Sequence, residues 1–261
     1  MTAATPTAAR RFFERRCREH ASLKRAVGEK AYLKSDLKFI GTMMPEIRQA
    51  AIDFAREHPE LTRRDLRPIV DELWSTEVFE LRSCGIALLS RRVKLLEERD
   101  LPWLIGLVRR SKTWAHVDWL AGEVVARVVG ESRSALRRLP AWARDDYFWV
   151  RRTALLAQLP QLRREGGDFA LIARLAAGML DEKEFFIRKA IGWVLREVSK
   201  KRPRLVFEFL REHRARVSAL TLREGAKYLP AAQRRALGLA ADAAWVKRAR
   251  ERAATRPAGA A

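Results

Sequence analysis

The feature that most constrains the fold is a short pattern that recurs six times along the 261-residue chain. In each copy an aliphatic residue is followed by a charged one, and small or aliphatic residues follow three to five positions later. The copies begin at Ile47-Arg48, Leu81-Arg82, Val117-Asp118, Val150-Arg151, Ile187-Arg188 and Leu222-Arg223, at spacings of 34, 36, 33, 37 and 35 residues. One helix pair every ~35 to 45 residues is the period of α-solenoids such as HEAT and armadillo arrays.

The segments around these copies have the periodicity of helices. Apolar residues recur at intervals of three and four, and the alternation typical of strands is absent. Short breaks with Pro or Gly separate the segments. The breaks are Gly41 to Pro45, His58-Pro59, Leu101-Pro102, Leu139-Pro140, Gly166-Gly167, Arg202-Pro203 and Leu229-Pro230. The sequence therefore predicts an all-α protein, a curved α-solenoid of about six HEAT-like helical pairs with helices of ten to twenty residues.

The two ends of the chain differ from its middle in composition. Residues 1–9 and 247–261 are small or charged, so we expect a disordered N-terminus and a flexible basic tail. Residues 10–246 are expected to form a single HEAT-like-repeat domain. No apolar run approaches the ~20 residues that span a membrane, and we expect no secretory signal. Cys17 and Cys84 form no CxxC pattern, which fits a reducing, intracellular setting without a zinc site.

The charge of the chain favours a polyanionic partner. Lys and Arg number 53 against 32 acidic residues, a net charge of +21, which favours nucleic acid first and an anionic membrane surface second. A protein-binding scaffold would need acidic partners to match this charge.

The charged position of the repeat has two interpretations. Five copies carry Arg there, and a row of arginines either follows a phosphate backbone or pairs with acids of the adjacent repeat. The overall charge favours phosphate. The third copy carries Asp118, which is either an ion-pair partner inside the solenoid or a catalytic carboxylate beside a bound polymer.

Tryptophans accompany the charged residues on two of the expected helices. Within residues 181–199, Trp193 lies off the apolar stripe among charged residues, and Gly192 beside it would allow a close approach. Within residues 111–129, Trp114 and Asp118 are four apart and share a face. Aromatic faces attract cations and stack on bases, although tryptophans at helical spacing also occur in cores. Trp149, Arg151 and Arg152 come one repeat later.

The sequence lacks the residue patterns for metal binding, Ser-His-Asp catalysis and nucleotide binding. His116 has no His or Cys partner at ligand spacing, so no metal is expected. The four histidines do not form a convincing Ser-His-Asp arrangement. No Walker loop or GxGxxG is present, so neither nucleotide hydrolysis nor a dinucleotide cofactor is expected.

Over roughly residues 25–230 the chain resembles the AlkD-type, HEAT-like-repeat DNA alkylation-repair glycosylases. Five stretches carry the resemblance: Tyr32; Phe39-Ile40-Gly41 with Met44-Pro45-Glu46-Ile47-Arg48; Ser111-Lys112-Thr113-Trp114 with Val117-Asp118; Trp149-Val150-Arg151-Arg152; and the long run from Lys183 to Glu197. The resemblance implies hydrolysis of the N-glycosidic bond of N3- or N7-alkylated purines in duplex DNA, without flipping the base into a deep pocket.

The resemblance also implies roles for individual residues. Asp118 is the catalytic carboxylate, Trp114 and Trp193 pack against the lesion-bearing nucleotide with Tyr32 nearby, and Arg152 contacts the DNA backbone. The further DNA contacts that we expect are Arg48, Arg151, Arg188 and Lys189. We expect a monomer without cofactor or metal, located in the cytoplasm at the nucleoid.

The chemistry agrees with a site of so few residues. An alkylated cationic purine is already a good leaving group, so one carboxylate suffices to stabilise the sugar cation and position water. Many members carry a Trp and an acid where this chain has Thr113 and Ala115-His116, which leaves the lesion range open between small and bulky adducts. A glycosylase that protects its host from bulky natural-product adducts is a close variant. The alternative of another class is a non-catalytic solenoid that grips damaged or branched DNA.

Overall fold

The computed structural model describes residues 4–164 and 166–240. Its described residues form helices joined by short connections, with one isolated β-bridge between Lys38 and Val78 and no strand. The prediction of an all-α protein is confirmed. The chain divides into two compact units, with the boundary between Ala157 and Gln158; these are called unit 1 and unit 2 below. Whether residues 10–246 form a single curved domain stays a prediction.

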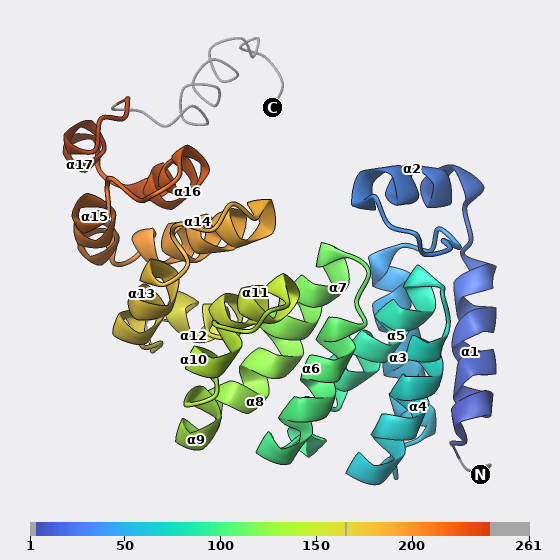
Figure 1. The fold of residues 1–261 in the computed structure, drawn as a ribbon. Coiled ribbons are helices and arrows are strands. Elements are labelled where there is room, and N and C mark those ends of the chain that lie inside the picture. Colours follow the sequence, from blue (N-terminus) through green and yellow to red (C-terminus); the bar gives the residue numbers. More distant parts are fainter. Residues whose placement is uncertain (1–3, 165, 241–261) are drawn as a thin grey trace, which may run out of the picture. The chain divides into compact units, whose positions relative to one another are not determined.

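Unit 1 contains the first eleven α-helices (Figure 1). They are α1 (Pro6–Glu19), α2 (Leu23–Leu33), α3 (Met44–Glu57), α4 (Arg63–Ser75), α5 (Phe79–Arg91), α6 (Leu101–Arg109), α7 (Trp114–Trp119), α8 (Ala126–Gly130), α9 (Arg133–Leu136), α10 (Leu139–Trp142) and α11 (Phe148–Leu156). A π-helical segment, η3 (Leu120–Val125), joins α7 to α8, and the short 3-10 helices η1 (Val93–Leu95) and η2 (Glu98–Asp100) precede α6.

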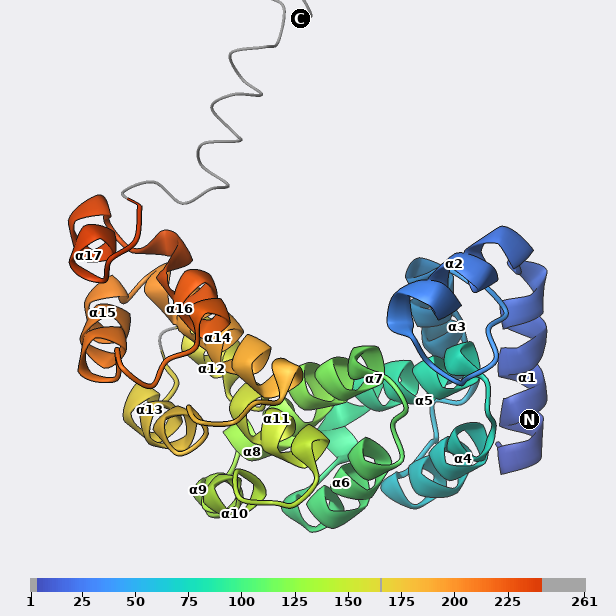
Figure 2. The same ribbon diagram turned by 45° about the horizontal axis from the view of Figure 1, so that its top comes forward.

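Unit 2 contains the remaining helices of the described chain. They are α12 (Leu159–Arg163), α13 (Phe169–Ala177), α14 (Phe185–Ser199), α15 (Pro203–Glu212), α16 (Ala219–Gly225), the 3-10 helix η4 (Ala226–Tyr228) and α17 (Ala231–Ala236). Helix α14 packs mainly against α16 and also contacts α12 and α15, an arrangement that can be followed in Figure 2.

Local sequence explains where the helices begin. Side chains of Thr5, Ser22, Ser132, Asp168 and Ser218 accept hydrogen bonds from free backbone N–H groups at helix starts. Proline occupies the first turn of α1, α3, α6, α10, α12 and α15, where its missing N–H costs nothing. The predicted breaks with Pro or Gly therefore coincide with helix boundaries.

The repeated aliphatic position lies in the core of each unit. Ile47, Leu81, Val117, Val150, Ile187 and Leu222 are at most 4% exposed. The stripe expected on α14, from Ile187 to Val198, is likewise buried. Each helix of such a pair buries its apolar face only against neighbouring helices. The recurring pattern therefore identifies the buried face of each helix.

Two details differ from expectation. Helices α9, α10 and α12 have only four or five residues, because proline starts and tight turns divide the chain more finely than the apolar pattern indicated. Helix α1 begins at Pro6 and buries Ala9, so part of the N-terminal segment expected to be disordered is helical. Cys17 and Cys84 are free thiols that meet in the core with their Sγ atoms 3.6 Å apart.

The expected basic tail over 247–261 lies outside the described residues. Of the helices that the structure describes, none combines the length and the apolar character needed to cross a membrane.

Candidate functional site

Helix α7 carries the two residues of the predicted site that lie four apart. Thr113 starts the helix, and its Oγ1 accepts a hydrogen bond from the N–H of Ala115 at 3.3 Å. Val117 is buried, while Trp114 and Asp118 are half-buried on the outer face. Directly after α7 the chain widens into the π-helical segment η3, a feature often found at functional sites because it changes the direction of the following side chains.

Asp118 forms a bidentate ion pair with Arg152 of α11. Nε and Nη2 of Arg152 donate to Oδ1 and Oδ2 of Asp118 at 2.6 and 2.7 Å. The Arg152 side chain is 3% exposed and that of Asp118 is 14% exposed. A buried guanidinium requires such a partner, and the two parallel hydrogen bonds fix the plane of the carboxylate. The accessible end of the pair is therefore the anion.

An aromatic edge adjoins this carboxylate. The rings of Tyr32 and Trp114 meet in a T-shaped contact with centroids 5.8 Å apart. Tyr32 belongs to α2, whose end is tied to the start of α7 because Oγ of Ser35 donates to the carbonyl of Lys112 at 3.2 Å. The structure thus brings Tyr32, Trp114, Asp118 and Arg152 together, all within unit 1.

His116 supports α7 from the inner side. Its Nε2 lies 3.0 Å from Ser83 Oγ and 3.2 Å from the carbonyl oxygen of Phe79, and its ring stacks on the Phe79 ring at 4.5 Å. Burial, with the charge of Arg82 as a second cause, lowers the pKa of His116 to about 3. The imidazole is therefore a neutral core group at neutral pH. Sequence reasoning missed Phe79 and Ser83, although both flank Leu81, the repeated residue of the copy that packs under α7.

Three arginines of the repeated position hold the connection that precedes their own helix. Arg82 Nε donates to the carbonyl of Thr76, Arg151 Nη1 to that of Asp145 and Arg188 Nε to that of Glu182, each 2.7 Å away and six residues back. Neither interpretation of the sequence pattern included this role. The DNA contacts of Arg151 and Arg188 stay predictions.

Arg48 is engaged at the surface of unit 1. Its Nη2 lies 2.8 Å from Glu123 Oε1, and its guanidinium lies over the Trp119 ring at 4.5 Å. A DNA contact by Arg48 stays a prediction.

Trp193, Arg188 and Lys189 lie in unit 2, on α14. Trp193 is half-buried, and the guanidinium of Arg163 lies 5.9 Å from the centroid of its ring. The packing of Trp114 and Trp193 about one nucleotide stays a prediction.

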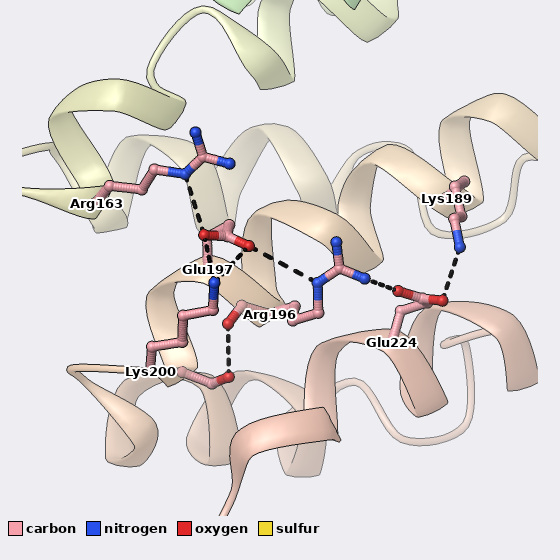
Figure 3. Close-up of polar contacts among 7 residues, drawn as sticks. Arg163, Lys189, Arg196, Glu197, Lys200 and Glu224 are labelled. Carbon is pink, nitrogen blue, oxygen red and sulfur yellow. Dashed lines mark hydrogen bonds and ion pairs between the residues drawn. The ribbon is translucent and has the colours of Figure 1, made fainter. Parts of the chain in front are cut away.

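Two carboxylates of unit 2, Glu197 and Glu224, bind the neighbouring cations (Figure 3). Glu197 accepts hydrogen bonds from Arg163 at 3.0 Å and from Lys200 at 2.9 and 3.0 Å. Glu224 of α16 binds Arg196 and, at 2.7 Å, Lys189. Burial raises the pKa of Glu224, but the cations, Lys189 first, hold it below its ordinary value. Lys189, predicted to contact DNA, is thus also part of a network within unit 2.

Gly192 has a packing role. A Cβ atom at this position would lie 2.6 Å from Cβ of Glu224, and one at Gly225 would lie 3.0 Å from Cβ of Leu195. The two glycines let α14 and α16 cross closely. The close approach that the sequence indicated at Gly192 is made by α16.

A metal site finds no support in the described part of the chain, where no group of three or more His, Cys, Asp or Glu side chains could hold an ion.

Comparison with protein families identifies one match over most of the chain. Residues 13–229 match the model of a family described as DNA alkylation repair enzyme. No curated protein matched the chain.

Among solved structures, a predicted DNA alkylation repair enzyme from Enterococcus faecalis is similar, with 26% identity and a TM-score of 0.70 over 80% of this chain and 97% of that one. AlkD2 from Streptococcus mutans has 17% identity and a TM-score of 0.57 over 80% of this chain and 99% of that one. The protein smu.31 from Streptococcus mutans UA159, with 17% identity and a TM-score of 0.56, covers 71% of this chain and 92% of its own. The latter two similarities concern the fold alone.

Proposed function

We propose, since this chain belongs to the DNA alkylation repair enzyme family, that it is a glycosylase that hydrolyses the N-glycosidic bond of cationic N3- or N7-alkylated purines in duplex DNA. The observation that carries the proposal is the Asp118 carboxylate, which is accessible, fixed in orientation by Arg152 and adjacent to the aromatic edge of Tyr32 and Trp114. The partner is alkylated duplex DNA, bound by a monomer without cofactor in the cytoplasm.

The reaction needs little more than this carboxylate. When the bond between C1′ and the purine nitrogen breaks, its electron pair leaves with the alkylated base, which becomes neutral. Positive charge then develops on the deoxyribose, and Asp118 stabilises it electrostatically. Asp118 positions a water that adds to C1′, and the proton of that water passes to the solvent.

Arg152 is the positioning residue of this mechanism. An ionised carboxylate has about four lone-pair sites, and the bidentate pair uses one on each oxygen, so each keeps one for water or the sugar. Because Arg152 is the more deeply buried partner, the negative end of the pair faces outward. The anion stabilises the sugar cation, and normal purines are spared because a neutral purine without a general acid is a poor leaving group.

The shallow setting of the site bears on the lesion range. Tyr32 is exposed, and Trp114 and Asp118 are half-buried, so the surface suits a lesion held without deep base flipping, bulky adducts included.

The test is base release from duplexes that contain 7-methylguanine, 3-methyladenine or a bulky N3 or N7 adduct, with wild type beside Asp118→Asn. We expect release to slow at least ~100-fold in the variant, as when one electrostatic stabiliser of a transition state is lost. The Kd for DNA should stay within about threefold, because Asn keeps an oxygen that accepts one hydrogen bond from Arg152. Thermal unfolding is followed in parallel. A variant that excises like wild type refutes the assignment, and joint loss of folding and DNA binding makes Asp118 a structural partner only.

A non-catalytic DNA-binding protein is the second candidate. One observation favours it, namely that both oxygens of Asp118 accept hydrogen bonds from Arg152. Tight binding by wild type with no base released from any of the three substrates would establish this alternative.

A further inference from the structure

Helix α2 is held less firmly than its neighbours and carries an exposed apolar surface. Of its 11 residues only Ala26 is buried. Leu23, Tyr32 and Val27 are 82%, 72% and 64% exposed, more than any other large hydrophobic side chain of the described residues. Figures 1 and 2 show α2 at the margin of unit 1. A helix of 11 residues is only marginally stable on its own. Several large exposed apolar side chains on such a helix are typical of a surface that a partner covers.

A glycine without a packing role lies in the middle of this helix. Gly28 is exposed, and a Cβ atom there would meet nothing within 4 Å. Glycine inside a helix lowers its stability, and it is tolerated where something must approach the backbone closely. At Gly41, by contrast, the positive φ of 87° and the close carbonyl of Ser22 require glycine. Nothing described in the fold uses the space at Gly28.

The exposed residues of α2 form one face. Six of the seven lie in two adjacent rows with a spacing of four residues, namely Leu23, Val27 and Ala31, and Lys24, Gly28 and Tyr32, and the seventh is Lys30. We call these six residues the α2 face. The missing side chain of Gly28 leaves a notch between Lys24 and Tyr32.

The charge around the α2 face fits a polyanion. Lys24, Lys30 and Lys34 are exposed, and no described acidic side chain pairs with any of them. The single acid of the helix, Glu29, is bound by Arg25 at 2.5 Å. The face is also continuous with the candidate site, because the ring of Tyr32 contacts that of Trp114.

We propose that the α2 face is a second DNA-binding surface, which holds the duplex beside the lesion. Apolar side chains pack well against deoxyribose and base steps in the minor groove, and lysines neutralise phosphates. Gly28 lets the DNA backbone approach the helix. The proposal rests on the proposed function only in taking DNA as the partner, and it concerns undamaged sequence that the chemistry does not touch.

The experiment compares Gly28→Gln with Gly106→Gln in the full chain. Both glycines are helical and face open space, and Gln is a good helix former, so the same substitution stabilises either helix. Fluorescence anisotropy with an undamaged duplex gives Kd over a range of salt concentrations. We expect Gly28→Gln to weaken binding about tenfold and Gly106→Gln to leave it unchanged. Lys24→Gln should lower the salt slope by about one.

The outcomes separate this proposal from the proposed glycosylase. Equal Kd values for Gly28→Gln and wild type overturn the α2 face, whether or not base release occurs. A wild-type dimer in sedimentation that Gly28→Gln dissociates also overturns it and makes a second copy the occupant. If Gly28→Gln binds DNA more weakly and wild type releases no base, the proposal for the α2 face is supported and only the glycosylase proposal is refuted.

Discussion

Asp118 in unit 1 and Glu197 in unit 2 are both carboxylates bound by arginine near a tryptophan, but their ion pairs point in opposite directions. At Asp118 the cation is buried, since Arg152 is 3% exposed and the carboxylate 14%. At Glu197 the carboxylate is buried, since its side chain is 8% exposed, while those of Arg163 and Lys200 are 48% and 42% exposed. In the first pair the less buried member is the anion, and in the second arrangement the less buried members are the cations.

Under the proposed function, the two arrangements suit different parts of the DNA. An outward anion beside aromatic rings suits a sugar that becomes cationic, whereas outward cations suit phosphates. A net charge of +21 describes neither arrangement, because the charge that a partner meets depends on which member of each pair is buried.

The strongest test of this contrast replaces the buried cation. Arg152→Met leaves the Asp118 carboxylate half-buried without a partner, so we expect a loss of about 3 kcal/mol in the free energy of unfolding. Base release should fall with it, because the carboxylate loses its orientation. The matched control Arg163→Met removes an exposed cation and should cost at most about 1 kcal/mol. Urea denaturation measures both, and equal losses would show that the two pairs do not differ in burial.

The sequence predicted the all-α fold and the buried faces because burial on a helix is periodic. Ile187, Val117 and their equivalents could be assigned to the core without knowing what covers them. The periodicity does not identify which helix covers each buried face. Gly192 is an example, because its close neighbour is Glu224, one repeat later.

The polar contacts of the site followed even less from the pattern. Asp118 and Arg152 are 34 residues apart, which is the repeat spacing, so their pairing agrees with the register. However, no periodicity distinguishes an arginine that binds a phosphate from one that binds a carbonyl six residues back, as Arg151 and Arg188 do. Their choice depends on the path of the preceding connection.

Acid should affect unit 1 through His116 before it affects the carboxylates. The folded pKa of about 3 lies below the ordinary 6.5, so the unfolded chain binds the extra proton and stability falls as pH drops below 6.5. Between pH 7 and pH 5 the loss amounts to about 2 kcal/mol. His116→Gln should abolish this part of the pH dependence, and His20→Gln, at an exposed position, should not. Thermal unfolding at pH 7 and pH 5 measures this loss of stability. If His116→Gln lost as much stability between the two pH values as wild type, the burial argument would be contradicted.

The smallest expected effect concerns the outward cations of unit 2. Burial raises the pKa of Glu197, but Lys200 and Arg163 outweigh it and hold the pKa below its ordinary value, so the carboxylate is ionised at neutral pH. Glu197→Gln removes that charge and frees Arg163 and Lys200 for phosphates. We expect DNA binding to tighten about threefold with a steeper salt dependence, at a cost of about 1 kcal/mol in stability. Glu208→Gln on α15 changes the net charge equally, but its carboxylate is 45% exposed and pairs with Arg204. If both variants tighten binding alike, net charge alone governs affinity and the orientation of the Glu197 network has no role in it.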